Sequence, residues 1–301
     1  MNLSPYKALG PDSIPNIVLK ECSDLLTPSL TVIFNAILDL NTYYNPWNKL
    51  ITIVIRKPGK PNYKAPKAYR PIALISTLAK LLTAIVAENF SNITETFKLL
   101  PNNHFSNCPG HSTADAIHYL TNKILHTWHT NKVASILFLD VEGAFPNTVT
   151  SRLLHNLKKR RTPCSIVNFV EQLNNRKTRL KFNNYTSEPI PIQNGIGQGD
   201  PLSMLLYIYY NTDILDTLVN QEKEDAIGYV DDIALIAIGD NFKETTSHLE
   251  NLMTKPEGSL EWSHFHNSKF EVNKSAVMHS PEKPLQTWKV TDMSQFTNQI
   301  S

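Results

Sequence analysis

The chain has 301 residues, of which 41% are hydrophobic and 19% are charged, and its formal net charge at pH 7 is +2. This composition excludes a disordered chain, because a sequence of this length and hydrophobicity can bury a substantial core. The sequence lacks an apolar run of about 18 residues and a secretory signal, so it gives no indication of a membrane protein. Three scattered cysteines, Cys22, Cys108 and Cys164, favour a reducing intracellular location, either nucleus or cytoplasm.

The first third of the chain is predicted to be mainly helical. Pro28 should divide a long apolar helical pattern, because its ring cannot donate to the helix ladder. A run of β-branched residues predicts a strand, and a proline-spaced basic loop follows it. We expect helices over 17–40 and 78–97, a strand over 51–55 and the basic loop over 56–67.

The middle of the chain alternates helices with short apolar strands. Ser112 and Asp115 resemble a capping box that starts a helix reaching about 128, where His126 and His129 form a lone HxxH pair without further metal ligands nearby. An apolar run then ends in Asp140, as a buried strand with an acid at its carboxyl end would. We expect strands over 133–140 and 176–182 and helices over 148–160 and 164–174.

A glycine-rich loop at 193–201 precedes a helix that should reach about 219, with Asp200 as N-cap and Pro201 as first helical residue. The GxGxG spacing argues against a dinucleotide-binding loop, which needs GxGxxG in a βαβ unit. The apolar runs at 226–238 predict a β-hairpin with Asp231 and Asp232 at its tip. A helix over 242–254, a strand over 270–278 and a tail complete the chain.

Aspartates are common in tight turns, so Asp231 and Asp232 alone could be turn residues. Asp140 at the end of a second strand changes that interpretation, because three gathered carboxylates need cations between them. Magnesium takes carboxylates together with phosphate oxygens, and a pair of such ions can activate a hydroxyl and stabilise a leaving oxygen. The three acids therefore predict a magnesium site for phosphoryl transfer.

Basic residues gather in two blocks. Residues 49–70 hold seven Lys and Arg side chains and no acid, and residues 152–181 hold nine with a single acid, Glu171. Each block is either a solvated face or a phosphate-binding surface.

Three motifs occur in the order of motifs A, B and C of reverse transcriptases: Phe138–Phe145 (FLDVEGAF), Gly197–Ser203 (GQGDPLS) and Tyr229–Asp232 (YVDD). Gly10–Asp12, Tyr69–Ile72 and Gly110–Thr113 add further matches. Over about residues 7–278 the chain resembles the reverse transcriptases of LINE-type (non-LTR) retrotransposons, and the ending Ala144–Pro146 is similar to the Tad-like branch.

The resemblance implies roles for individual residues. Asp140 and Asp231 would be the principal Mg²⁺ ligands for two ions, with Mn²⁺ as a substitute, and Asp232 would support them. Phe145 would close off the sugar 2′ position, with a core phenylalanine as the alternative. Lys274 would protonate the leaving pyrophosphate, with a solvated lysine as the alternative. The nucleotide and the template would contact Arg70, Lys57, Gln198 and Gly199.

The implied fold is α+β: a right-hand polymerase with an antiparallel-sheet palm and fingers, its thumb largely missing. We expect fingers and an N-terminal region over 1–132, a palm over 133–278 with 148–194 partly returning to the fingers, and a tail or truncated thumb start over 279–301. The chain would leave no room for an endonuclease domain and would be part of a longer polyprotein. Pro146 replaces a second aspartate that motif A often carries, which should alter the local turn more than catalysis.

The implied activity is RNA-directed DNA polymerase, with RNA template, DNA primer and deoxynucleoside triphosphates as partners. Two alternatives stay open at this point. One is another palm-type polymerase, and the other is a catalytically silent retroelement remnant that keeps the fold and binds nucleic acid.

Overall fold

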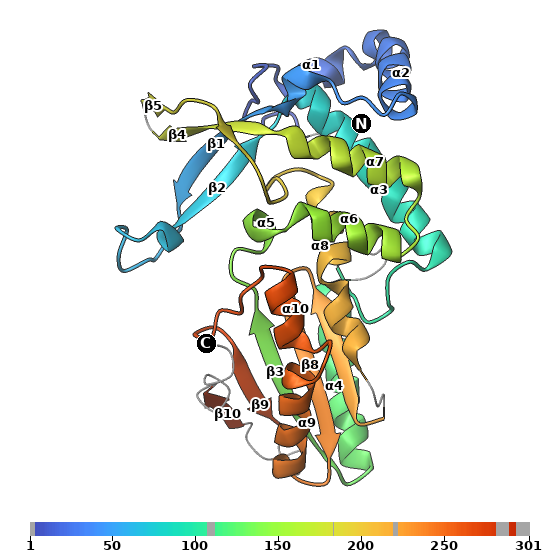
Figure 1. Ribbon diagram of the computed structural model, residues 1–301, viewed down its shortest axis with the longest axis vertical. Coiled ribbons are helices and arrows are strands. Elements are labelled where there is room, and N and C mark those ends of the chain that lie inside the picture. Colours follow the sequence, from blue (N-terminus) through green and yellow to red (C-terminus); the bar gives the residue numbers. More distant parts are fainter. Residues whose placement is uncertain (1–3, 107–111, 183, 219–221, 281–288, 293–301) are drawn as a thin grey trace. The chain divides into compact units, whose positions relative to one another are not determined.

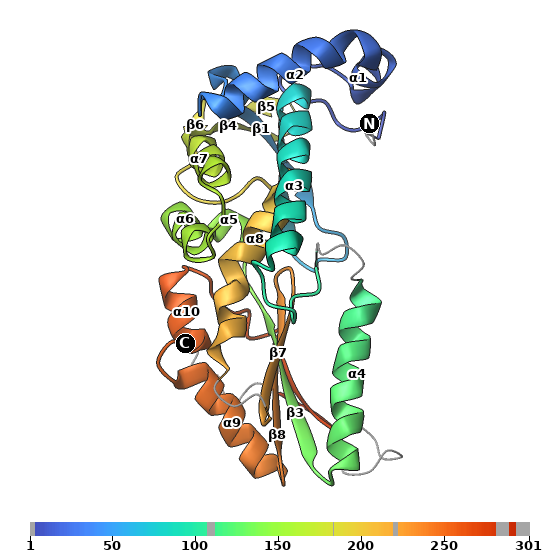
Figure 2. The ribbon, with the colours of Figure 1, turned by 90° about the vertical axis from the view of Figure 1, so that its right-hand side faces the viewer.

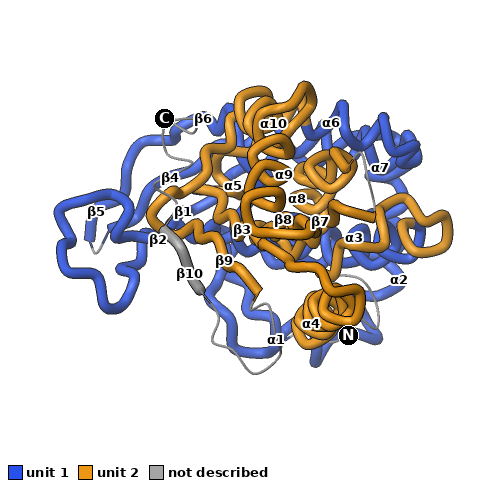
Figure 3. The backbone as a smooth tube through the Cα atoms, turned by 90° about the horizontal axis from the view of Figure 1, so that it is seen from below, with its two compact units in different colours: residues 1–93, 153–203 blue, residues 94–152, 204–301 orange. Residues whose placement is uncertain are grey.

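The computed structural model describes residues 4–106, 112–182, 184–218, 222–280 and 289–292 (Figure 1). They form two compact units, which Figure 3 colours separately: residues 1–93 with 153–203, and residues 94–152 with 204–301. Each unit therefore joins segments that are distant in sequence. Helices and two sheets occur together, as expected for the α+β class. The names fingers and palm, with their predicted boundaries, stay predictions.

Unit 1 contains a five-stranded sheet. β1 (Lys49–Arg56) lies between β2 (Tyr69–Leu74), to which it is antiparallel, and β4 (Lys177–Phe182), to which it is parallel. The short strands β5 (Tyr185–Thr186) and β6 (Ile190–Pro191) pair with β4. On the buried face the hydroxyls of Thr52 and Thr178 share a 2.7 Å hydrogen bond, so both polar groups are satisfied inside the unit.

The helices of unit 1 are α1 (Asn16–Glu21), α2 (Ser23–Asp39), most of α3 (Thr77–Phe97), most of α6 (Thr150–Lys159) and α7 (Cys164–Gln172), with the 3₁₀ turns η1 (Asn45–Asn48), η2 (Pro66–Ala68) and η3 (Leu173–Asn175). The prediction that Pro28 divides the first helix is wrong. The break lies at Cys22, and Pro28 is inside α2 on an exposed face, where water can bond the carbonyl that the proline leaves unpaired.

The start of α3 is organised by residues 10–12. Asp12 Oδ2 accepts hydrogen bonds from Thr77 N at 2.7 Å and Ser76 Oγ at 2.5 Å, which satisfies groups at the helix N-terminus. A Cβ at position 10 would come 2.2 Å from the carbonyl oxygen of Ile75, so only glycine allows this approach. These residues therefore have a structural role in unit 1.

Unit 2 is built on an antiparallel sheet in the order β10 (Lys289–Asp292), β9 (Ala276–His279), β3 (Val133–Asp140), β8 (Asp232–Gly239) and β7 (Glu224–Tyr229). Figure 2 shows α4 (Thr113–His129) on one face and α9 (Phe242–Thr254) on the other. The remaining helical elements are α5 (Ala144–Asn147), α8 (Ser203–Asn211), the 3₁₀ turn η4 (Thr212–Thr217) and α10 (Ser259–Phe265). Among the described residues, no helix has both the length and the hydropathy needed to cross a bilayer.

The central strands β3 and β8 are buried on both faces, which explains why they are nearly continuous apolar runs. On the α4 side a cluster of buried side chains includes Phe105, Ile124, Ile136, Ile227 and Ile236. Ser112 caps α4 through the expected reciprocal contacts with Asp115, whereas Cys108, Gly110 and His111 lie outside the described residues.

Two predicted boundaries in the last third of the chain are wrong, and two elements there were not predicted. The strand expected over 270–278 begins only at Ala276, because Lys274 N bonds back to Glu271 O at 2.9 Å in a turn. The helix expected from Pro201 begins at Ser203, and Asp200 Oδ1 instead accepts from Leu202 N at 3.0 Å in the preceding turn. The helix α10 and, within the expected tail, the strand β10 were not predicted.

Candidate active site

The hairpin of β7 and β8 turns through two residues, Val230 and Asp231. Tyr229 pairs with Asp232 in the ladder, and Val230 has a φ of +55°. A positive φ is unfavourable for a β-branched side chain and marks a strained position that its surroundings must hold. The tip of this hairpin is therefore a constrained turn that presents Asp231.

Hydrogen bonds from neighbouring segments hold this turn. Val230 N donates to Ser106 Oγ at 3.0 Å, and Asn211 Nδ2 donates to Val230 O. Ser106 and Asn211 are both buried, and Thr113 Oγ1 donates to Tyr229 Oη at 2.9 Å. Residues from α4, from α8 and from the segment before α4 thus fix the backbone on which the acids are carried.

The three predicted acids belong to adjoining positions. Asp140 ends β3 directly opposite Asp232, the first residue of β8, and Asp231 precedes it in the turn. Burial raises the pKa of Asp231 above its usual range, and the charge of Asp140 raises it further. Burial also raises the pKa of Asp232, with Asp231 and Asp140 adding to the shift. The carboxylates therefore repel one another in a partly desolvated place.

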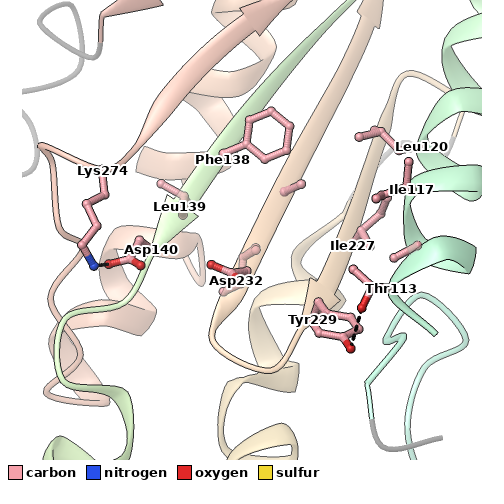
Figure 4. Close-up of a pocket in the computed structure, with 13 residues that line it drawn as sticks. Thr113, Ile117, Leu120, Phe138, Leu139, Asp140, Ile227, Tyr229, Asp232 and Lys274 are labelled. Atoms are coloured by element: carbon pink, nitrogen blue, oxygen red, sulfur yellow. Dashed lines mark hydrogen bonds and ion pairs between the residues drawn. The ribbon is translucent and has the colours of Figure 1, made fainter. Parts of the chain in front are cut away.

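Lys274 lies at the same site. Its Nζ donates to Asp140 Oδ2 at 2.7 Å (Figure 4), and this hydrogen bond is the main cause that raises the pKa of Lys274. The lysine precedes β9 in a turn, so its predicted place on a strand is wrong. Its predicted role at the site stays a prediction.

A metal ion would have to rearrange these side chains. Within the described residues, no group of three His, Cys, Asp or Glu side chains lies close enough together to hold a metal ion. The pair His126 and His129 belongs to no such group either. The donor chemistry nevertheless fits a hard divalent cation, because all three side chains offer carboxylate oxygens whose mutual repulsion such an ion would relieve.

Phe145 stacks on a tyrosine of the core. Its ring centroid is 5.3 Å from that of Tyr207, with an interplanar angle of 25°. Tyr207 is fully buried, and burial followed by the charge of Asp231 raises its pKa well above the usual value. Phe145 itself is half-buried. Its partly exposed ring therefore packs on the buried ring of Tyr207, which is close to the acids.

A cavity of about 410 Å³ opens beside the acids. Its walls are apolar side chains of α4 and the sheet, among them Ile117, Leu120 and Phe138, and Asp140, Asp232 and Lys274 lie at one end (Figure 4). This arrangement offers an apolar surface next to a charged centre.

In unit 1 the loop 195–200 is held close to the sheet. Ala73 N donates to Gln198 O at 3.1 Å, and Gly199 has a φ of +108°. The buried Arg176 donates through Nη2 to Gly195 O at 2.6 Å. Burial raises the pKa of Asp200, an effect that the nearby Arg176 partly offsets. The loop thus has a defined backbone at the two residues predicted to bind nucleotide or template.

The other predicted cations of unit 1 lie on or beside its first two strands. Arg70 is exposed on β2 opposite Ile55, and Lys57 follows β1, where its N donates to Ala68 O at 2.8 Å. Lys57, Arg70, Gln198 and Gly199 therefore belong to unit 1, whereas the acids, Lys274 and Phe145 belong to unit 2.

Comparison with known proteins decides the family. The sequence model described as reverse transcriptase (RNA-dependent DNA polymerase) matches residues 55–293, which include all nine predicted site residues. The chain belongs to the reverse transcriptase family.

Relatives of the same kind support this membership. The chain is 29% identical over 253 residues to the probable RNA-directed DNA polymerase from transposon BS of Drosophila melanogaster, covering 82% of the chain and 28% of that protein. It is 31% identical over 216 residues to the corresponding protein of transposon X-element, covering 70% of the chain and 23% of that protein. The chain thus spans less than a third of these relatives' length.

The fold is similar to that of solved telomerase structures. A telomerase from Candida tropicalis in complex with a fragment of telomeric RNA matches 83% of this chain and 46% of its own, with a TM-score of 0.53 and 12% identity. An apo form truncated from the C-terminal domain gives a TM-score of 0.54 at 10% identity, over 88% of this chain and 60% of its own.

Four residues that hold these backbones and rings were missed by the sequence reasoning: Ser106, Asn211 and Tyr207 in unit 2, and Arg176 beside the loop of unit 1. Ser106 and Asn211 are single polar residues without a local pattern, so their role arises only from tertiary contacts. The sequence near Tyr207 carried a signal, because Tyr207, Tyr209 and Tyr210 place three hydroxyl groups within four positions of one apolar helix, and a buried tyrosine hydroxyl usually needs a partner. Arg176 was counted in a basic block, and nothing local distinguished it from its exposed neighbours.

Proposed function

We propose that the chain is the polymerase core of a LINE-type retrotransposon RNA-directed DNA polymerase. The observation that carries this proposal is the register of Asp140 against Asp232, with Asp231 in the strained turn beside them, in a chain of the reverse transcriptase family. A primer 3′-oxygen would form a bond to the α-phosphorus of a deoxynucleoside triphosphate while the bond to pyrophosphate breaks.

Asp140 and Asp231 would hold Mg²⁺, or Mn²⁺ in its place, with Asp232 in support. The bound ions would supply Lewis acidity at the attacking and leaving oxygens. Lys274 would give up its contact with Asp140 and deliver a proton to the departing pyrophosphate. Phe145 would restrict the space at the sugar 2′ position.

The remaining roles belong to unit 1. Arg70, with Lys57, would bind the triphosphate, for which guanidinium geometry is suited. Gln198 and Gly199 would lie against template and incoming nucleotide. The partners would be an RNA template and a DNA primer, inside a longer retroelement polyprotein in an intracellular compartment. The assignment to the Tad-like branch and the domain names fingers, palm and truncated thumb belong to the same proposal.

Extension of a DNA primer on an RNA template in the presence of Mg²⁺ tests the proposal. Wild type should incorporate deoxynucleotides, and Asp231→Ala should not, because the turn then lacks its half-buried carboxylate. Asp240→Ala is the matched control, since Asp240 is an exposed carboxylate just past the other end of β8. Incorporation that survives Asp231→Ala would refute the site, a preference for ribonucleotides would favour another polymerase, and inactivity of wild type would favour a silent remnant.

A further inference from the structure

A short segment before α4 extends the sheet of unit 2 beyond β7. His104 pairs with Gly228 in a parallel bridge. Gly228 N donates to Asn103 O at 3.0 Å, and Phe105 N donates to Gly228 O at 2.9 Å. The segment 103–106 therefore lies along the outer edge of β7 and ends beside the hairpin turn.

The side chain of His104 is buried against this strand. It is 1% exposed, and a Cβ added at Gly228 would lie 3.0 Å from His104 Cδ2 and 3.1 Å from its Nε2. On the other side the same Cβ would lie 3.0 Å from Leu215 Cδ1. The imidazole ring thus packs on the bare backbone of Gly228, an approach that the missing side chain permits.

The ring of His104 is connected to the hairpin turn through one serine. His104 Nδ1 lies 3.3 Å from Ser106 Oγ, and Ser106 Oγ accepts from Val230 N at 3.0 Å. A serine hydroxyl has one hydrogen to donate and two lone pairs with which to accept. Since one lone pair takes the Val230 N–H, the hydroxyl hydrogen remains to be donated, and His104 Nδ1 is within reach of it.

The turn depends on where this oxygen points. Val230 has a φ of +55°, a conformation that persists only where its surroundings hold it. A serine side chain has three staggered χ1 positions, of which an orientation toward the turn is needed to bring Oγ to Val230 N. A second hydrogen bond, from the serine hydroxyl to a ring buried beside it, would select that orientation.

We propose that His104 is a positioning residue: its Nδ1 accepts the hydroxyl hydrogen of Ser106, which orients Ser106 Oγ toward Val230 N and so holds the turn that carries Asp231. This hydrogen bond requires the imidazole tautomer whose hydrogen is on Nε2. The inference rests on the proposed function only where it links the turn to primer extension. The alternative is a histidine that only fills space in the core.

Hydrogen exchange of a single amide tests this arrangement without catalysis. In the full chain with isotope-labelled valine, NMR gives the exchange rate of the Val230 amide, and the Val277 amide of β9 reports unfolding of the whole sheet. His104→Leu removes the acceptor and fills most of the same space. His118→Leu, at an exposed histidine of α4, is the matched control.

We expect His104→Leu to accelerate exchange of the Val230 amide about tenfold relative to Val277, the effect of losing one good hydrogen bond, and His118→Leu to leave it unchanged. Ser106→Ala should accelerate it by a similar factor. The double variant of His104→Leu with Ser106→Ala should exchange no faster than Ser106→Ala alone, because His104 acts through Ser106.

A conservative variant separates the hydrogen bond from packing. His104→Asn keeps an acceptor near the position of Nδ1 but fills less space than leucine. It should therefore restore most of the protection of the Val230 amide, although packing alone would make it the worse variant. If His104→Leu fails to fold, His104→Gln takes its place, since its carboxamide extends past the position of Nδ1.

Three results would overturn the inference: acceleration below about twofold in His104→Leu, additive effects in the double variant, or faster exchange in His104→Asn than in His104→Leu. In primer extension, His104→Leu should lower kcat about tenfold and change the KM for the nucleotide less than about twofold, because it disturbs the turn that carries an acid and not the cations expected to bind the triphosphate.

The two proposals can fail separately. If wild type does not extend a primer but exchange at Val230 depends on His104 through Ser106, the proposed function fails and the positioning of the turn stands. If wild type extends a primer while exchange at Val230 ignores His104, the positioning role fails and the proposed function stands.

Discussion

The hairpin turn of unit 2 and the loop 195–200 of unit 1 both require positive φ, and they meet the requirement with different residue types. The hairpin uses Val230, a β-branched residue with a φ of +55°, whose two backbone polar groups are bound by Ser106 and Asn211. The loop uses glycine, with φ of +94° at Gly195 and +108° at Gly199.

A backbone with positive φ can therefore be built from a strained side-chain-bearing residue or from glycine. A strained residue persists only where its surroundings determine its conformation, which makes the hairpin a rigid support for carboxylates. Glycine avoids the strain at Gly195 and Gly199, and at Gly197 it also avoids a tight contact, because a Cβ there would lie 3.2 Å from Arg176 Nη1. Hydrogen bonds hold both segments, but only the hairpin needs them to stabilise a strained residue.

The largest expected effect distinguishes the two acids of the hairpin. Asp231 is half-buried in the turn, whereas Asp232 is exposed at the start of β8. We expect Asp231→Asn to lower kcat for primer extension at least about 10³-fold and Asp232→Asn about 10-fold to 10²-fold, because only the first removes a principal metal ligand. Steady-state kinetics checks the ratio, and equal losses would show that the hairpin presents the two carboxylates equivalently.

The next effect concerns Phe145, which is carried by the same unit. We expect Phe145→Val to reduce the preference for deoxynucleotides over ribonucleotides about 10-fold to 10²-fold, because the smaller side chain admits the 2′-hydroxyl. The ratio of kcat/KM for the two triphosphates measures this. Tyr207→Phe keeps the stacked ring and serves as the control; loss of discrimination in that variant would assign the effect to the tyrosine hydroxyl instead.

A smaller effect tests the glycine loop. Gly59→Ala introduces a strain of about 1–2 kcal/mol, since the φ of +72° at Gly59 is close to the left-handed region, whereas the φ of +108° at Gly199 lies outside that region and disfavours alanine more strongly. A Cβ would meet nothing within 4 Å at Gly59 and would be in ordinary contact with Ala73 O, at 3.4 Å, at Gly199, so the backbone conformation decides the difference. We expect only Gly199→Ala to lower extension, by about tenfold, because only there must the loop change its backbone conformation. A similar loss of activity in both variants would contradict the role of this conformation.

The smallest effect concerns the strain at Val230. Val230→Gly removes the strain but frees the turn, so the free energy of unfolding should change by no more than about 1 kcal/mol while extension falls a few fold. Chemical denaturation and extension assays give the two quantities. Val230→Asn, which tolerates this conformation, should keep more activity than Val230→Gly. If Val230→Gly instead matches wild type in extension, the hydrogen bonds of Ser106 and Asn211 suffice without the restricted valine.

The elements that the sequence predicted well are those with a strong local pattern. β3 and α9 have the predicted bounds, because a buried strand and an amphipathic helix each leave a periodic signature. The sequence could predict that these acids lie close together, because the apolar run of β3 ends in Asp140 and that of β8 begins with Asp232, and the ladder places the two residues opposite each other. The short α10 and the strand β10 have no comparable pattern.

What could not be predicted depends on contacts between distant residues. The bonds of Ser106 and Asn211 to Val230 span 124 and 19 positions, and the ion pair of Lys274 with Asp140 spans 134. Neither a propensity nor a period encodes such a contact. The predicted start of α8 was wrong for a related reason. Asp200 and Pro201 are as common in a turn as at the start of a helix, and here they form the turn that precedes the helix.

The stack of Phe145 on Tyr207 has a consequence for how such enzymes diverge. Tyr207 is 0% exposed, so a substrate would touch Phe145 and never the tyrosine beneath it. A substitution at Tyr207 would look like a neutral change in the hydrophobic core. If it tilted the ring of Phe145, however, it would change which sugar the site accepts. Under the proposed function, selection for the correct nucleotide would therefore also act on Tyr207, a core residue that no substrate touches.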